Sequence, residues 1–311
     1  MLRHLLFRGL RALLTVALVV TFAFVVLRLS ADPALIILGP EASPEMIAAF
    51  RRSWGLDEPI WVQYVDYFRA ILRGELGRSM RDGRPAIELV AERIPATLAL
   101  TLPALALKLS IGVPAGIWAS LHRGTVIDRA VMALAVAGFT VPSFVLGLVL
   151  VLIFSVWLGW LPSGGQDGWT HAILPIVTMG VGGAAVLARF TRSAMLEVLG
   201  QPYMRTASAK GVPWARAIRD HALPNAAIPT VTIVGFMVGT LIAGAVVVES
   251  VFSWPGVGRL LVVAVANRDL AVVQCILLLV AATMVCSNLL VDFLYGFLDP
   301  RLRRGARAGA H

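Results

Sequence analysis

Hydrophobic residues run in six long blocks along the chain, and polar or basic segments separate the blocks. The blocks lie near 10–29, 97–119, 131–158, 172–190, 226–248 and 271–298. Each is long enough to supply the roughly 20 residues with which an α-helix crosses the hydrocarbon core of a bilayer. Because lipid offers no hydrogen-bond partners to the backbone, spanning segments of this length are helices. The pattern therefore predicts an all-α integral membrane protein with six transmembrane helices.

Basic residues between the blocks predict the orientation. Arginine and lysine gather before the first block, between the second and third, between the fourth and fifth, and after the sixth. The loop 159–171 contains neither lysine nor arginine. In a six-span chain the four basic positions fall on one side, so the positive-inside rule predicts that the N- and C-termini are both cytoplasmic.

The segment between the first two blocks departs from the charge pattern, because it carries eight arginines from Arg51 to Arg93. It is longer than the loops to which the charge rule applies. Ser43-Pro44-Glu45 has the order of a helix N-cap and first turn. Aromatic residues farther on recur at helical spacing, at Tyr64, Tyr67 and Phe68. We expect a folded, helical extracytoplasmic segment at the outer interface.

These patterns divide the chain into four parts. The expected parts are an N-terminal transmembrane helix (1–30), an extracytoplasmic helical segment (31–96), a core of five transmembrane helices (97–298) and a cytoplasmic tail (299–311). The first block has no small-residue cleavage site after it, so we interpret it as a retained span.

Composition agrees with a membrane location and removes several function classes. The 311 residues are 58% hydrophobic and 14% charged, against roughly 25% charged in a soluble domain. In such a chain the net charge of +9 is explained by topology signals and does not indicate nucleic-acid binding. Cys275 and Cys286 would lie about 16 Å apart along one helix, too far for a disulfide.

Motifs for chemistry are absent from the sequence. A P-loop needs Gly-Lys-Ser/Thr, but leucine follows Lys108 and glycine follows Lys210, the two lysines of the chain. The sequence also lacks H-E-x-x-H, G-x-S-x-G and paired-cysteine motifs. We therefore expect no catalytic residue, no metal site and no cofactor in this chain, and any ATP would bind to a partner.

The stretch 203–224, between the fourth and fifth blocks, is basic and has helical periodicity. Gly211-Val212-Pro213 divides it into two short helices. Trp214, Ile218 and Ala222 share one face of the second helix, and Leu223-Pro224 is expected to end that helix. The pattern predicts an amphipathic hairpin along the cytoplasmic face. By periodicity alone, an interfacial helix resting on lipid headgroups fits equally well.

The residues of this hairpin resemble the cytoplasmic EAA loop of ATP-binding-cassette (ABC) importer permeases. That loop reads E-A-A, three residues, G, nine residues, I-x-L-P, and this chain matches the spacing with Arg205-Thr206-Ala207, Gly211, His221 and Leu223-Pro224. Arg205-Thr206 replaces Glu-Ala and His221 replaces Ile. These variants are similar to the dipeptide/oligopeptide/nickel branch, as are the stretches 54–80, 246–261 and 299–303.

The resemblance implies a type I ABC importer permease fold, with the hairpin 203–224 between helices 4 and 5 as a coupling helix that docks on a cytoplasmic ATPase. The implied coupling residues are Arg205, Thr206, Ala207, Lys210, Gly211, Trp214, Ile218, His221, Leu223 and Pro224. The implied partners are a second, homologous permease in a heterodimer, two cytoplasmic ABC ATPase subunits that bind ATP and Mg, an extracytoplasmic solute-binding protein and membrane lipid. The implied location is the bacterial inner (plasma) membrane, with several crossings.

Ionisable residues inside apolar blocks are candidates for the substrate pathway. Lys108 either lines the pathway or pairs with a carbonyl or an acid inside the bundle. Glu249, expected at the outer end of the fifth span, either meets a substrate amine or forms a salt bridge with Arg259 or Arg268. Small and helix-breaking residues mark either close packing or bending points, at Gly138, Pro142 and Gly182. The candidate pathway residues are Lys108, Pro142, Gly182, Glu249 and Trp254.

The resemblance implies a permease that translocates di- or oligopeptides by alternating access, while the ATP is hydrolysed on partner subunits. The same machinery with nickel, a metal chelate, glutathione or an opine as cargo is the alternative. The segments 31–96 and 250–270 are the expected contacts for the binding protein. An ion-coupled secondary transporter would need mid-bilayer acids, and a membrane enzyme would need a catalytic motif; both classes fit the sequence less well.

Overall fold

The computed structural model describes residues 10, 13–22, 24–26, 33–39 and 41–298. All regular elements in this part are helical, apart from an isolated bridge between Arg78 and Pro85. Contacts divide the chain into two compact units. The large unit comprises Leu98–Trp254 and the residues from Thr283 onward, and the small unit comprises the residues up to Thr97 and Pro255–Ala282.

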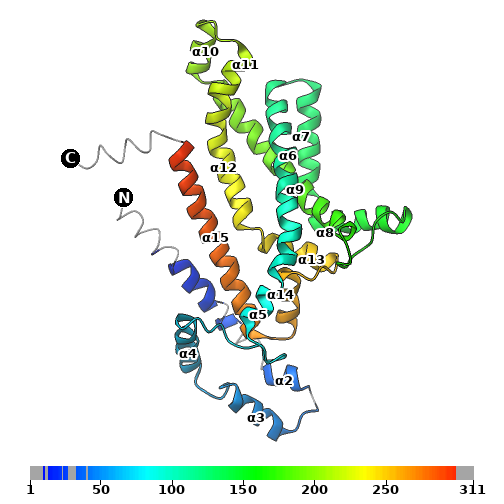
Figure 1. Cartoon of the computed structure of the whole chain (residues 1–311), viewed down its shortest axis with the longest axis vertical. Coiled ribbons are helices and arrows are strands. Elements are labelled where there is room, and N and C mark those ends of the chain that lie inside the picture. Colours follow the sequence, from blue (N-terminus) through cyan, green and yellow to red (C-terminus); the bar gives the residue numbers. More distant parts are fainter. Residues whose placement is uncertain (1–9, 11–12, 23, 27–32, 40, 299–311) are drawn as a thin grey trace, which may run out of the picture. The chain divides into compact units, whose positions relative to one another are not determined.

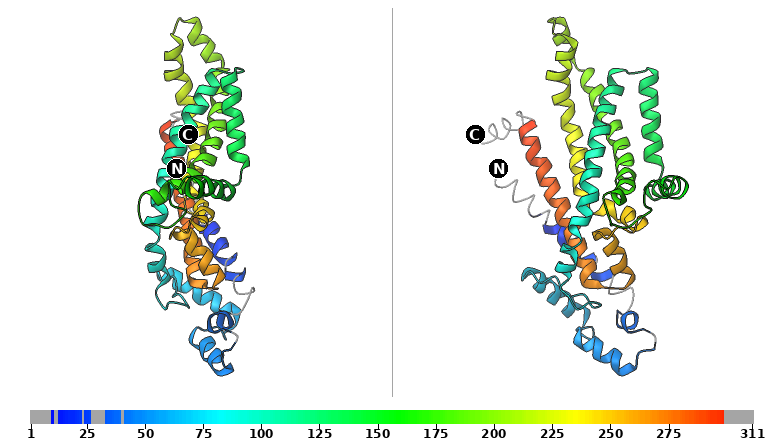
Figure 2. Two further views of the ribbon diagram at one scale, coloured as in Figure 1. Left: turned by 90° about the vertical axis from the view of Figure 1, so that its right-hand side faces the viewer. Right: turned by 45° about the vertical axis from the view of Figure 1, so that its right-hand side comes forward.

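The large unit is a bundle of long helices with α9 at its centre (Figures 1 and 2). Its elements in chain order are α6 (Ile94–Leu121), α7 (Val126–Thr140), α8 (Ser143–Leu150), the π-helix η1 (Val151–Trp157), α9 (Thr170–Leu199), α10 (Pro202–Ala209), α11 (Trp214–Ala217), the π-helix η2 (Ile218–Ala222), α12 (Leu223–Gly239), the 3₁₀ turn η3 (Ala243–Ala245) and α13 (Val246–Val251). Helices α7, α8 and α12 pack against α9.

Helices α6 and α9 approach each other closely because glycine faces alanine across their interface. A Cβ built on Gly112 would lie 2.7 Å from the carbonyl oxygen of Ala184, and one built on Gly116 would lie 2.5 Å from that of Ala188. Real Cβ atoms do not come this close, so only glycine fits at these two positions. Small residues serve the same purpose in other membrane helix pairs, which gain packing contacts when their backbones approach.

Four helical stretches are long and apolar enough to cross a bilayer: Ala86–Leu121, Thr170–Leu199, Trp214–Gly239 and Leu270–Val291. They coincide with the second, fourth, fifth and sixth predicted blocks, which confirms the all-helical, multi-span class. Of the first block, residues 13–22 and 24–26 are helical. The count of six spans and the cytoplasmic termini stay predictions, since 1–9 and 299–311 lie outside the described residues.

The third block, predicted as one span over 131–158, is bent. Val126–Thr140 and Ser143–Trp157 meet at 97°, so they form either a broken span or a re-entrant loop. The bend occurs at Pro142, and Val141 before it has φ −74° and ψ 120°. Proline lacks the N–H that would continue the helix and disfavours the α conformation in the residue before it. Hydrophobicity is continuous across the bend and did not reveal it.

The fifth span ends earlier than predicted. It was expected to reach residue 248, but α12 ends at Gly239, and the chain then forms η3 and the separate helix α13. Glycines at 239 and 244 weaken the helix in this region. Residues 246–248 are as apolar as a span, so composition alone extended the prediction across the break.

The small unit contains α2 (Pro33–Leu38), α3 (Pro44–Ser53), α4 (Ile60–Leu72), α5 (Ala86–Ala91), α14 (Val257–Ala266) and the first part of α15 (Leu270–Leu298). The predicted cap of α3 is present, since the Ser43 hydroxyl accepts a hydrogen bond from the backbone N–H of Met46. Phe24 packs against Tyr64 and Tyr67, with ring centroids 5.4 and 6.0 Å away.

Candidate coupling hairpin and translocation helices

The predicted hairpin exists as α10, a turn, and the helix that starts at Trp214 (Figure 1). Gly211 has φ +74°, a conformation that glycine adopts without strain. Its N–H donates to the carbonyl of Ser208, and the N–H of Val212 donates to that of Ala207. These bonds satisfy carbonyls at the end of α10 and turn the chain sharply toward Pro213. The predicted division at 211–213 is confirmed.

One side of the hairpin is held in a buried apolar cluster with α9 and α12. The members of this hairpin core are Ala194, Met195, Val198, Met204, Ala207, Ala217, Ala222 and Ala226. Ile218 and Leu223 pack against it and are half-buried. Because the core contains residues from both arms and from two long helices, the hairpin is fixed to the bundle by burial of apolar surface.

The other side of the hairpin is exposed. Trp214 leaves 56% of its surface uncovered. The remaining exposed coupling candidates are Arg205, Thr206, Lys210, Gly211, His221 and Pro224. Of the ten candidates, Ala207, Ile218 and Leu223 thus lie on the inner side. Ala222, expected on the same helix face as Trp214, differs from it in exposure, because Ala222 is completely buried.

The second arm of the hairpin does not end at Leu223-Pro224 as the sequence suggested. α11, η2 and α12 form one continuous helical stretch, Trp214–Gly239. The π-helical segment Ile218–Ala222 directly precedes Pro224, where it accommodates the missing N–H of the proline. The exposed Trp214 therefore lies in the first turn of a helical stretch that continues into the candidate span.

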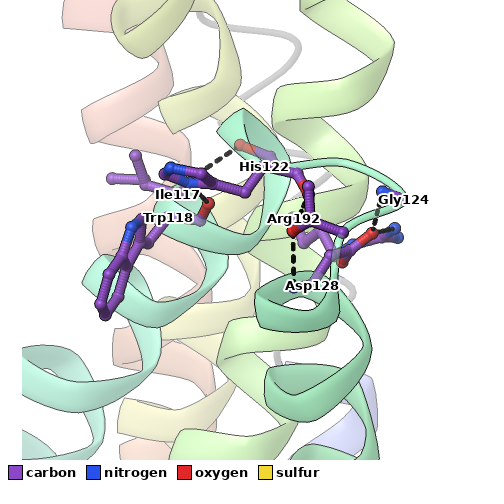
Figure 3. A network of polar contacts seen from close by, with 8 residues as sticks. Ile117, Trp118, His122, Gly124, Asp128 and Arg192 are labelled. Atoms are coloured by element: carbon purple, nitrogen blue, oxygen red, sulfur yellow. Dashed lines mark hydrogen bonds and ion pairs between the residues drawn. The ribbon is translucent and has the colours of Figure 1, made fainter.

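A polar network at the α6–α7 turn was not found from the sequence (Figure 3). Asp128 accepts two hydrogen bonds from Arg192 on α9, at 2.5 Å from Nε and 2.7 Å from Nη2. Its carboxylate also accepts from the backbone N–H of Gly124 at 2.9 Å. His122 stacks edge-on against Trp118 in the preceding turn of α6. The carboxylate of Asp128 thereby joins the loop, α7 and α9.

The sequence held one local signal for this network. Thr125 stands three residues before Asp128, and its hydroxyl accepts from the Asp128 N–H as the N-cap of α7. The three-residue spacing from Thr125 to Asp128 is typical of a helix N-cap with an acid in the first turn, so the sequence could have predicted it. The partner Arg192 lies 64 residues away in the chain, so no local pattern could identify it.

The candidate pathway residues do not form one cluster. Lys108 is half-buried, its stem lies against Gly183, and no hydrogen bond or ion pair joins it to another described residue. Glu249 lies completely buried on α13, beyond the end of α12 where it was expected. Trp254 is buried, and its backbone N–H donates a hydrogen bond to the backbone carbonyl of Glu249 at 2.8 Å. Pro142 forms the bend of the third block, whereas α9 continues through Gly182.

Solved structures with the same arrangement of helices are ABC importers. The chain superposes on an inward-facing methionine ABC transporter, MetNI, with a TM-score of 0.57 over 68% of this chain and 96% of that one, at 21% identity. An amino acid ABC transporter with histidines gives a TM-score of 0.52 over 67% and 93%, at 19% identity. At these identities the similarity shows the fold, that of type I ABC permeases.

Sequence relatives give the family. Residues 112–304 match the binding-protein-dependent transport system inner membrane component, and residues 1–101 match the N-terminal family of the same system. The glutathione transport system permease protein GsiC of Salmonella choleraesuis is 46% identical over 95% of this chain and 96% of its own length. GsiC of Escherichia coli K12 is 44% identical over the same shares. The chain therefore belongs to the binding-protein-dependent transport system inner membrane components, as a multi-pass inner-membrane permease of the peptide/nickel group of ABC importers.

Proposed function

We propose that this permease carries di- and oligopeptides inward, and that glutathione, itself a tripeptide, is the first solute to test. The observation that carries the proposal is the 46% identity, over nearly the whole chain, to relatives described as glutathione transport permeases. Nickel, metal chelates and opines remain the competing cargoes within the same group, and nothing in the described helices favours any of them.

The proposed mechanism is alternating access driven from outside this chain. ATP and Mg²⁺ bind to two cytoplasmic ABC ATPase subunits, and the exposed side of the hairpin docks on one of them. A rigid helix with an apolar anchor and a polar rim is a common recognition element for a groove. The continuous helical stretch Trp214–Gly239 supports this role, because it connects Trp214 directly to a candidate membrane span.

The assembly that we propose contains a second, homologous permease and an extracytoplasmic solute-binding protein. In it, the chain has six spans with both termini in the cytoplasm. The segments 31–96 and 250–270 contact the binding protein, and the exposed faces of the large unit meet the second permease across the pathway.

The test is uptake by the complete importer reconstituted in proteoliposomes. We expect labelled glutathione to accumulate only when ATP is present inside and the binding protein outside. Uptake driven by a proton gradient without ATP would identify a secondary transporter and overturn the mechanism. Uptake of nickel or an opine, with neither glutathione nor a tripeptide transported, would overturn the cargo and leave the mechanism standing.

A further inference from the structure

Arg189 on α9 lies between two aromatic rings on an exposed face of the large unit. Its guanidinium carbon is 5.3 Å from the ring centroid of Phe139 on α7 and 5.6 Å from that of Phe190. The two rings remain 58% and 43% exposed, and Arg189 is exposed as well. These distances are those of cation–π contacts.

The guanidinium of Arg189 extends from its own turn toward the middle of α9. The midpoint of α9, which spans Thr170–Leu199, falls at Ala184 and Ala185. A Cβ on Gly138 would touch Ala185 at 3.3 Å, so Phe139, the next residue on α7, lies close to this level. Arg189 therefore extends roughly 6 Å back along α9, four residues at 1.5 Å each. Arginines near the end of a span normally reach the other way, toward the headgroups.

The hydrogen-bonding capacity of Arg189 is unused. Within the described residues, no hydrogen bond or ion pair to Arg189 is present. Arg192, one turn farther along α9, instead forms the two-bond ion pair with Asp128. Contacts with ring faces engage none of the five N–H donors of a guanidinium. An arginine within an apolar span costs free energy unless it meets water, a counter-charge or a ligand.

The surroundings of Arg189 are more typical of the wall of an aqueous pathway than of a lipid-facing surface. One side of α9 is buried in the bundle, at Gly180, Ala184 and Ala188. The sector of its surface that carries Arg189, Phe190 and Ser193 is exposed. The charge of Arg189 on this sector favours contact with water or protein over contact with lipid. Aromatic walls with a few polar groups are the usual composition of a small-molecule site.

We propose that Arg189, backed by Phe139 and Phe190, binds a carboxylate group of the transported solute as it passes along the pathway. This inference rests on the proposed function, because a peptide supplies the carboxylate. A guanidinium forms two parallel hydrogen bonds with a carboxylate, and the two rings hold it in position without competing for its donors. A single such contact binds the solute weakly enough to release it at the next step.

The experiment compares two probes in the reconstituted importer: a tripeptide with a free C-terminal carboxylate and the same tripeptide as its amide. In the wild type we expect faster uptake of the acid. In Arg189→Gln, acid uptake falls roughly tenfold, the effect of losing a charge-assisted hydrogen bond, and amide uptake is unchanged. Arg189→Lys, which keeps the charge, retains part of the preference for the acid. Arg129→Gln, the same change at an exposed position near the start of α7, leaves the preference unaltered.

The outcomes separate this inference from the proposed function. If the wild type transports neither tripeptide, the proposed cargo fails and the carboxylate site fails with it. If the wild type transports acid and amide equally, or Arg189→Gln slows both in the same proportion, the carboxylate site alone is refuted. If Arg189→Gln separates the two permeases on size-exclusion chromatography, Arg189 pairs with the second subunit instead of the solute, which also refutes it.

Discussion

At the scale of single residues, the ion pair between Asp128 and Arg192 is largely buried, with side-chain exposures of 6% and 23%. Asp128→Asn removes the charge and leaves the arginine half-buried without its counter-ion. Breaking a buried pair from one side costs more than the pair itself contributes. We expect a loss of about 1–3 kcal/mol in the free energy of unfolding, measured by thermal unfolding of the purified protein in detergent.

The control is a second aspartate–arginine pair, whose two side chains are mostly exposed to solvent. Asp66 and Arg69 on α4 are 61% and 67% exposed, and exposed pairs contribute about 0–1 kcal/mol. Asp66→Asn should therefore leave the unfolding temperature nearly unchanged. The double variant Asp128→Asn with Arg192→Gln should recover part of the loss, since it removes the unpaired charge. Equal effects of the two single asparagine variants would contradict the assigned role of Asp128.

At the scale of helix pairs, the contact between α6 and α9 depends on glycine. In Gly116→Ala the new methyl would meet the Ala188 carbonyl at 2.5 Å, so the two backbones must separate. The higher helix propensity of alanine contributes about 1 kcal/mol, and overpacking costs about 1–3 kcal/mol. We expect a net loss of stability, visible as a lower unfolding temperature. Gly244→Ala is the control, since its added Cβ meets nothing within 4 Å, and should be neutral or stabilising.

The coupling hairpin allows a test at the same scale. Trp214→Ala removes the exposed anchor without touching the hairpin core, so membrane insertion should be normal. Because central aromatic anchors carry much of the energy of an interface, we expect binding of the purified ATPase subunit to weaken by at least about 30-fold. Trp160→Ala, in the loop 159–171 and 69% exposed, is the matched control. Unchanged ATPase binding in Trp214→Ala would refute the docking role.

Helix class and the position of the hairpin were predictable because each depends on local pattern. Apolar length identified the long helices, and Gly211-Val212-Pro213 marked the turn that the structure contains. The kink at Pro142 and the end of α12 at Gly239 depend on where a helix breaks inside apolar sequence, which hydrophobicity does not report. The contacts of Asp128 with Arg192 and of Arg189 with Phe139 join residues far apart in the chain, so they required the folded bundle.

At the scale of the whole molecule, the bent third block decides how the chain threads the membrane. If α7 with α8 and η1 is a broken span, the α6–α7 turn and the loop 159–171 lie on opposite sides. If the pair is re-entrant, they lie on the same side. Helix α9 has 30 residues, about 45 Å at 1.5 Å each, so in both cases it separates the loop 159–171 from the coupling hairpin.

Single cysteines at Arg123, Ser163 and Ser208, three exposed positions in these segments, distinguish the two threadings once Cys275 and Cys286 have been replaced. An impermeant maleimide applied to intact spheroplasts should label Ser163→Cys alone, and all three variants after lysis. That result follows from a broken span, since the two basic segments then share the cytoplasmic side. Labelling of both Arg123→Cys and Ser163→Cys before lysis would show a re-entrant pair. It would also contradict the Asp128–Arg192 ion pair, since Arg192 lies at the end of α9 that leads to the coupling hairpin, away from the loop 159–171.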